Sequence, residues 1–391
     1  MATKVKILIL SGEKSPYRAT LKKALDPSFE VSFISSISEI TTSIGAFKPN
    51  VFIHDWTATD ESQGRQFHFR YSQVSNEENI FRVIVATKIT PSLLAFVNDT
   101  YVDKVIDYAT AKLNLSPQIE MLINNAGHKA ILDLIKATKS GGSRYSQKEI
   151  DILVENTYLN FPHDVNVKLE MGNLRLRQDN PSKAREIATA LLAETPHNMR
   201  AVNLLSRIAM KEGKWDEAQK LLAKANTISP KNGERLLMLG DACYGKGDLD
   251  AALEFYKEAA GSNPDLAEKA ESAMGKVKVS QGDLEGALGL LQKSASEEEA
   301  AGYFNNAAVI AVKNGDSKHA IELYETALKA LKTDKIKHII FYNLALSYRR
   351  VGSNEEAVKF TKRALKYKPD FDKAKRQLSQ LENTSVQAKS S

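Results

Sequence analysis

Polar side chains that could bind a ligand stand directly after short apolar runs near the start of the chain. Asp55, Thr87 and Asp107 each follow such a run, and Glu13 comes shortly after the first of them. If these runs are parallel strands, their carboxyl ends lie at one edge of a sheet, which is where such sheets bind ligands. These residues are therefore the first candidates for a binding site.

No arrangement of residues indicates an enzyme or a cofactor site. The segment Ser11–Ser15 lacks the glycine spacing and the Gly-Lys-Ser ending of a phosphate-binding loop. His54 and Asp55 are neighbours on a strand, so their side chains point to opposite faces, and His68 is expected at the surface. The histidines are scattered, and the single cysteine, Cys243, is expected to be a packed thiol. We therefore expect no catalytic residue, no cofactor and no enzymatic activity.

The apolar runs predict an α/β domain. They cover residues 5–10, 31–34, 51–54, 83–86 and 104–106. Helical stretches separate them, and continuous short apolar runs are typical of strands buried on both faces. This alternation predicts a parallel sheet with helices on both faces.

The second half of the chain is a repeat with a period of about 34 residues. Its copies begin at Val165, Met199, Gly233, Glu268, Ala301 and His338. Each copy has an alanine twenty positions in, and glycine ends the first helix of five copies. A proline closes four copies, and Asp179-Asn180-Pro181 turns the chain in the first copy, which lacks the glycine. These recurring alanine, glycine and proline positions predict six helical hairpins.

The repeat resembles the tetratricopeptide repeat, which stacks into a superhelix. In that family, positions two, five, six, nine, twelve and thirteen of the first helix face a concave groove. The resemblance implies a groove lined by Asn173, Arg177, Arg200, Asn203, Arg207, Lys211, Tyr244, Asn306, Asn343 and Arg350. Because basic side chains outnumber acidic ones there, we expect an acidic or carboxylate-ended peptide segment to bind. For any single residue, a solvated helix face is the alternative.

The α/β part resembles the receiver domain of bacterial response regulators, which has a flavodoxin-like fold. The resemblance makes Asp55 the phosphoacceptor, Thr87 the switch threonine, and Glu13 with Asp55 the candidate magnesium ligands. However, Asp107 stands where the family has lysine, and Thr59 where it has proline. An aspartate there repels a phosphoryl group by ~1–4 kcal/mol at about 4 Å. The resemblance therefore implies a degenerate receiver, or pseudo-receiver.

We predict four segments along the chain. Residues 1–125 form the receiver-like domain, 126–164 a helical connector, 165–370 the six repeats, and 371–391 a capping helix and tail. The connector is expected to bend at Gly141-Gly142 and to restart at a capping box beginning with Ser146. Its alternative is an additional hairpin on the first repeat. The receiver-like part and the repeats are expected to fold separately.

Composition narrows the function classes. The chain has 391 residues, 42% of them hydrophobic, and a formal net charge of +6 that is spread along it. A mild charge disfavours a dedicated nucleic-acid binder. The start of the chain does not resemble a signal peptide, and no segment is long enough to span a membrane, so we expect a cytoplasmic protein. We expect a bacterial signalling scaffold that binds protein partners through the groove and the receiver-like surface, with a homodimer left open. The alternative is a response regulator, switched by phosphorylation of Asp55, with the repeats as output domain.

Overall fold

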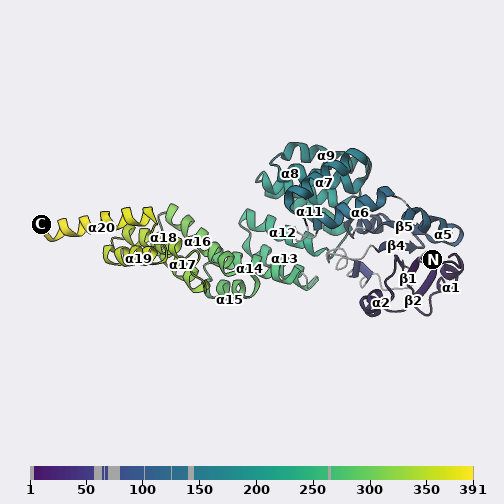
Figure 1. Cartoon of the computed structure of the whole chain (residues 1–391), viewed down its shortest axis with the longest axis horizontal. Helices are drawn as coiled ribbons and strands as arrows, with labels where there is room; N and C mark the ends of the chain where they lie inside the picture. The colour runs from purple at the N-terminus through teal and green to yellow at the C-terminus, as the bar shows by residue number, and fades with distance from the viewer. Residues whose placement is uncertain are drawn as a thin grey trace. The chain divides into compact units, whose positions relative to one another are not determined.

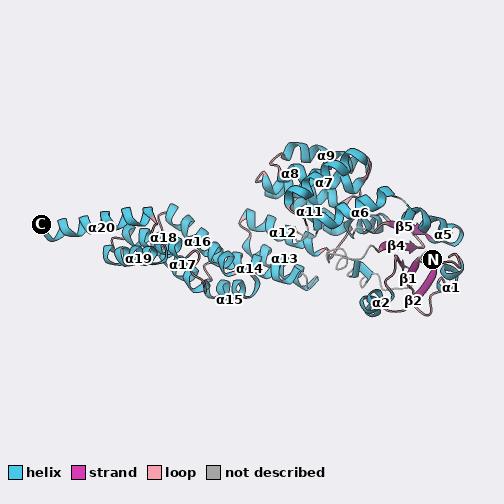
Figure 2. Cartoon of the chain, in the orientation of Figure 1, coloured by secondary structure: helices cyan, strands magenta, loops and turns pink. Residues whose placement is uncertain are grey.

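The computed structural model describes residues 4–56, 64–65, 67–68, 80–100, 102–124, 126–139, 145–262 and 266–390. The chain divides into two compact units (Figure 1). Unit 1 comprises Met1–Asp248 and Gly261–Asp265, and unit 2 comprises Leu249–Ala260 and Leu266–Ser391. The described strands all lie in unit 1, whereas the described part of unit 2 is helical (Figure 2). No described helix combines the length and the apolar character needed to cross a bilayer.

Unit 1 begins with a five-stranded parallel sheet, as the alternation of strands and helices predicts. Its strands are β1 (Lys6–Leu10), β2 (Glu30–Ile34), β3 (Val51–Asp55), β4 (Phe81–Ala86) and β5 (Lys104–Asp107). Their order is β2-β1-β3-β4-β5, with every neighbouring pair parallel. This is the order of flavodoxin-like doubly wound sheets, so the structure supports the expected α/β class.

Helices cover both faces of the sheet. They are η1 (Ile37–Glu39), α1 (Arg18–Lys23), α2 (Ile40–Phe47), α4 (Pro91–Thr100) and α5 (Tyr108–Asn124). Ile9 of β1 shares one core with Leu21 of α1 and Leu115 of α5. Its neighbour Leu8 packs with Ile44 of α2 in a second core. Successive strand residues point to opposite faces, which explains why the runs are apolar throughout.

A helical hairpin connects the sheet to the repeats. It consists of α6 (Ala126–Lys139) and α7 (Gln147–Asn160). Leu134 of α6 and Val154 of α7 share a core with Met171 in the first helix of the first repeat. Ser146 caps α7 in a capping box with Glu149, as predicted. This packing agrees with the additional-hairpin alternative, and the expected bend at Gly141-Gly142 lies outside the described residues.

Among the described residues, twelve helices follow in the order that the repeat predicts. They are α8 (Val165–Arg177), α9 (Pro181–Glu194), α10 (Met199–Lys211), α11 (Trp215–Ile228), α12 (Gly233–Lys246), α13 (Leu249–Ser262), α14 (Ala267–Gln281), α15 (Leu284–Ser294), α16 (Glu297–Lys313), α17 (Ser317–Ala330), α18 (Lys337–Arg350) and α19 (Asn354–Tyr367). A further helix, α20 (Asp372–Ser390), continues beyond the expected end of the capping helix.

The predicted glycines and alanines have the expected structural roles. The five glycines after the first helices have φ between 73° and 87°, in the left-handed region that favours glycine. In the first copy Asp179 takes this conformation, with φ 60°. All six alanines at offset twenty are fully buried: Ala184, Ala218, Ala252, Ala287, Ala320 and Ala357.

Helix α4 of the α/β domain packs directly on the repeats. Ala95 of α4 shares a small core with Met199 of α10 and Ala225 of α11. Ser92 donates a hydrogen bond to the carbonyl oxygen of Ile228 at 3.0 Å. The α/β domain and helices α8 to α12 therefore belong to one compact unit, which differs from the expected separation at the connector.

Candidate functional site

The carboxyl edge of the sheet places Asp55 beside two serines. β1 pairs with both β2 and β3, so Ser11 and Asp55 lie where the strand order reverses, the usual ligand position in such sheets. Both side chains are fully buried. The hydroxyls of Ser11 and Ser15 each donate a hydrogen bond of 2.7 Å to Asp55 Oδ2. Arg18 holds the loop by donating to the carbonyl oxygen of Ser11 at 2.7 Å.

The other strand-end candidates, Thr87 and Asp107, differ in their exposure and in their hydrogen bonding. Thr87 is exposed directly after β4. Asp107 caps the start of α5, where hydrogen bonds from the side chain and backbone of Thr110 hold the pKa of its carboxyl below the ordinary value. Burial raises the pKa of the Tyr108 hydroxyl, and the negative charge of Asp55 raises it further. The edge therefore has acidic and hydroxyl groups near Asp55.

This edge does not fit the magnesium ion that the receiver resemblance implies. Magnesium in proteins is usually held by one or two carboxylates together with substrate phosphates and several waters. Instead, Asp55 receives two hydroxyl donors, and Glu13 is an exposed loop residue. Within the described residues, no group of three His, Cys, Asp or Glu side chains is placed to hold a metal. Thr59, the other departure from the receiver pattern, lies outside the described residues.

A buried pair of histidines lies under the same edge. His54 Nδ1 and His68 Nε2 are 2.9 Å apart, and neither side chain is exposed. Burial lowers the pKa of His54 to about 3 and holds that of His68 well below its ordinary value. The expectation that His68 is a surface residue is therefore wrong. The rings of Phe52, Trp56 and Phe96 surround it.

In unit 1, the predicted groove cations bind groups of the same chain. Arg200 donates to Asn166 Oδ1 at 2.6 Å, and its guanidinium lies 3.5 Å from Glu170. Arg207 donates to Asn173 Oδ1. The other two also pair with carboxylates, Arg177 with Asp151 at 2.9 Å and Lys211 with Asp179 at 2.8 Å.

Two of these contacts, Arg200 with Asn166 and Arg207 with Asn173, connect neighbouring first helices at equivalent repeat positions. Arg207 and Asn173, for example, are one repeat apart. Asn203 also receives a bond, from Arg235 Nε at 3.4 Å, whereas Tyr244 is half-buried. We call positions two, five, six, nine, twelve and thirteen of the first helices the first-helix surface. On this surface, the predicted residues of α8 and α10 are bonded within the chain.

The first-helix surface of unit 2 has weaker internal contacts. Asn343 of α18 donates to Asn305 of α16 at 3.1 Å, and Asn306 is exposed. Arg350 donates to the carbonyl oxygen of Val312 at 3.4 Å. Arg349 donates to Gln380 of α20 at 3.1 Å. Amides and carbonyls rather than carboxylates accept these bonds.

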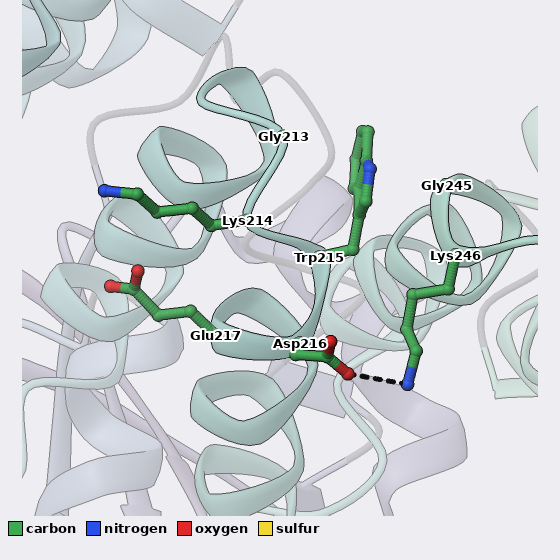
Figure 3. Close-up of a pocket in the computed structure, with 7 residues that line it drawn as sticks. All are labelled: Gly213, Lys214, Trp215, Asp216, Glu217, Gly245 and Lys246. Carbon is green, nitrogen blue, oxygen red and sulfur yellow. Dashed lines mark ion pairs between the residues drawn. The ribbon is translucent and has the colours of Figure 1, made fainter.

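A shallow hollow that the sequence did not predict lies beside Trp215 in unit 1 (Figure 3). Its volume is about 450 Å³, and it lies where α11 begins and α12 ends. The indole packs on Gly245, where an added Cβ would lie 2.5 Å from the ring. Asp216 and Lys246 form an ion pair of 2.8 Å across it. Since these charges already neutralise each other, the hollow serves helix packing more than recognition.

Family models described as "Tetratricopeptide repeat" match the second half of the chain. They cover residues 169–233, 209–277, 301–330 and 339–371. No curated protein matches the chain in sequence.

Several solved structures are similar to part of the fold. The APC/C hetero-tetramer Cut9–Hcn1 is 17% identical, with a TM-score of 0.45, over 83% of this chain and 60% of that one. The apo quorum sensor NprR from B. thuringiensis is 13% identical, with a TM-score of 0.42, over 67% and 81%. MamA AMB-1 is 26% identical, with a TM-score of 0.31, over 42% and 95%. These TM-scores are below 0.5, so the solved structures support no conclusion. The matches to the family models show that this chain contains tetratricopeptide repeats.

Proposed function

We propose that the chain is a non-enzymatic, cytoplasmic scaffold that binds a peptide segment of a protein partner on its repeats. The observation that carries this proposal is the row of amide and cationic side chains on the first-helix surface, at equivalent positions of successive repeats. Repeat stacks present extended surfaces, and side-chain amides can hydrogen-bond an extended backbone. Tetratricopeptide repeats bind protein partners, which agrees with this use.

We assign the α/β domain to the same scaffold as a degenerate receiver in bacterial signalling. Its strand order and the position of Asp55 at the end of β3 support the receiver assignment. The serine hydroxyls on Asp55 and the helix-capping role of Asp107 support its degeneracy. In this role the domain offers a second binding surface for a partner or another copy of the chain.

A capture experiment tests the scaffold proposal. The full chain is used to isolate a partner from a bacterial lysate, and the partner is shortened until binding is lost. We expect a short linear segment to retain the affinity of the whole partner. A partner that binds only as an intact folded domain contradicts the proposal. So does a failure to find any partner whose capture the untagged chain competes away.

The alternative is a response regulator switched by phosphorylation, and the position of Asp55 at the reversal of strand order favours it. A phosphoryl group on Oδ2 has to displace the hydroxyls of Ser11 and Ser15. We expect beryllofluoride with magnesium to leave the NMR signals around Asp55 and Thr87 unchanged, and Asp55→Asn to retain partner binding. A stoichiometric, magnesium-dependent response that Asp55→Asn abolishes supports the alternative instead.

A further inference from the structure

The first-helix surface carries different charge in the two units. In α8, α10 and α12 its positions hold four basic and three acidic residues. In α14, α16 and α18 the same positions hold five basic residues and no acidic one. The basic residues of this surface in unit 2 are Lys269, Lys276, Lys313, Arg349 and Arg350. Most of the net positive charge of this surface therefore lies in unit 2.

In unit 1 the chain neutralises three of the four cations on this surface with its own carboxylates. Arg200 lies against Glu170, and both side chains are nearly buried, with 11% and 6% of their surface exposed. Arg177 and Lys211 pair with Asp151 and Asp179, at 2.9 Å and 2.8 Å. A ligand carboxylate has to displace these intramolecular partners, which offsets most of the attraction it gains.

In unit 2, three cations of this surface, Lys313, Arg349 and Arg350, remain exposed. Within the described part of the chain, Lys313, Arg349 and Arg350 form no ion pair, and all three are exposed. Arg349 and Arg350 contact only neutral oxygens, those of Gln380 and Val312. An anionic ligand can therefore reach them without competing against a carboxylate of the chain.

Apolar and amide groups accompany these charges. Ile339 is 42% exposed, and Tyr342 and Leu346 are partly exposed beside it on α18. The amide of Asn343 bonds Asn305 in α16, and Asn306 adds an exposed amide. A surface that combines such groups suits an extended segment that carries both acidic and apolar side chains.

The capping helix α20 adds an amide with unsatisfied hydrogen-bonding groups. Gln377 stands one repeat length after Asn343. Its side chain is 4% exposed, and neither Oε1 nor Nε2 has a partner among the described residues. Burying an amide without partners costs about 1–3 kcal/mol, so a bound segment that hydrogen-bonds this amide would offset that cost.

We infer that an extended acidic segment of a partner protein binds the first-helix surface of unit 2, with Gln377 of α20 taking part. The inference rests on the proposed scaffold function and names its partner chemistry and its location. The carboxylates of the segment pair with Lys313, Arg349 and Arg350. Its backbone bonds the amides of Asn306 and Gln377.

Two charge-matched variants test the location. One carries Lys313→Gln, Arg349→Gln and Arg350→Gln, and the other carries Arg177→Gln, Arg207→Gln and Lys211→Gln. Both lose three positive charges. The probe is a fluorescent peptide of alternating glutamate and leucine, with lysine–leucine and serine–leucine peptides as charge controls. Anisotropy of the full-length chain gives the affinity, and circular dichroism checks the fold.

We expect the unit 2 variant to bind the acidic peptide about tenfold more weakly, since each exposed pair contributes up to about 1 kcal/mol. We expect the unit 1 variant to bind it as the wild type does. Equal loss in both variants, loss in the unit 1 variant alone, or no preference for the acidic peptide overturns the inference. None of these results removes the scaffold proposal, which fails only if the capture experiment yields no linear partner segment.

Gln377→Leu tests the contribution of α20. Removing a buried amide that lacks partners is expected to leave the urea midpoint unchanged or raised, whereas affinity for the acidic peptide falls several-fold. Unchanged affinity with unchanged stability excludes Gln377 from the site. Ser379→Leu, at an exposed position of the same helix, is the control and is expected to leave affinity unchanged.

Discussion

Asp99 at the end of α4 forms an ion pair with Arg235 of α12, and neither side chain has any exposed surface. The two residues are 136 positions apart. Arg235 also donates to the carbonyl oxygen of Ser229 at 2.6 Å. A charge buried in this way is costly unless its partner is present. The pair therefore fixes the α/β domain to the third repeat.

We expect Asp99→Ala to destabilise unit 1 by about 3–5 kcal/mol, because it leaves the guanidinium of Arg235 buried without its counter-charge. Urea unfolding followed by circular dichroism measures this loss. Glu186→Ala, which breaks the exposed pair with Lys183, is the control and is expected to cost less than about 1 kcal/mol. A double variant, Asp99→Leu with Arg235→Met, is expected to recover most of the stability. If Asp99→Ala unfolds like the wild type, the pair does not hold the two parts together.

The His54–His68 pair predicts that unit 1 loses stability in acid. The folded pKa of His54 is about 3, below its ordinary value, so the unfolded chain binds more protons below about pH 6.5. Stability is complete above that pH and falls as the pH drops towards 3. At about pH 5, His54 alone accounts for a loss of about 2 kcal/mol.

A double variant, His54→Leu with His68→Leu, isolates this effect. We expect the difference in unfolding free energy between neutral and acid pH to shrink by at least about 2 kcal/mol relative to the wild type. His163→Asn, at an exposed position, is the control and should leave the difference unchanged. An undiminished acid sensitivity in the double variant shows that other groups cause it.

Two glycines of unit 2 predict opposite responses to alanine. An added Cβ at Gly275 of α14 would lie 2.6 Å from Leu291 Cγ of α15. We expect Gly275→Ala to destabilise the chain by about 1–3 kcal/mol. At Gly289 of α15 nothing lies within 4 Å, so Gly289→Ala is expected to stabilise by up to about 1 kcal/mol. Thermal unfolding compares the two, and the same sign for both refutes the close packing of α14 and α15.

The sequence predicts local structure and the repeat well, because both leave periodic signals. The apolar runs identify the strands, and the glycines with φ near 80° identify the helix ends. The hydrogen bond from Arg207 to Asn173 could also have been predicted from the sequence, because the two residues are one repeat apart and chemically complementary. Polar residues that recur at the repeat period can therefore bond one another within the chain rather than a ligand.

Contacts between segments that are distant in the sequence produce no periodic pattern from which they could be predicted. Asp99 and Arg235 look like ordinary exposed charges of two amphipathic helices, and only the packing of α4 on α10 and α11 buries them. The burial of His68 likewise depends on Phe52, Trp56 and Phe96, which come from different elements. No periodicity in the chain links these residues.

Hydrogen exchange of the full-length chain with the glutamate–leucine peptide tests the central claim most directly. The account predicts slower amide exchange in α16, α18 and α20 when the peptide is added, with α8 and α10 unchanged, and loss of this protection in the variant lacking Lys313, Arg349 and Arg350. Protection of α8 and α10 with unchanged exchange in α16, α18 and α20 contradicts it.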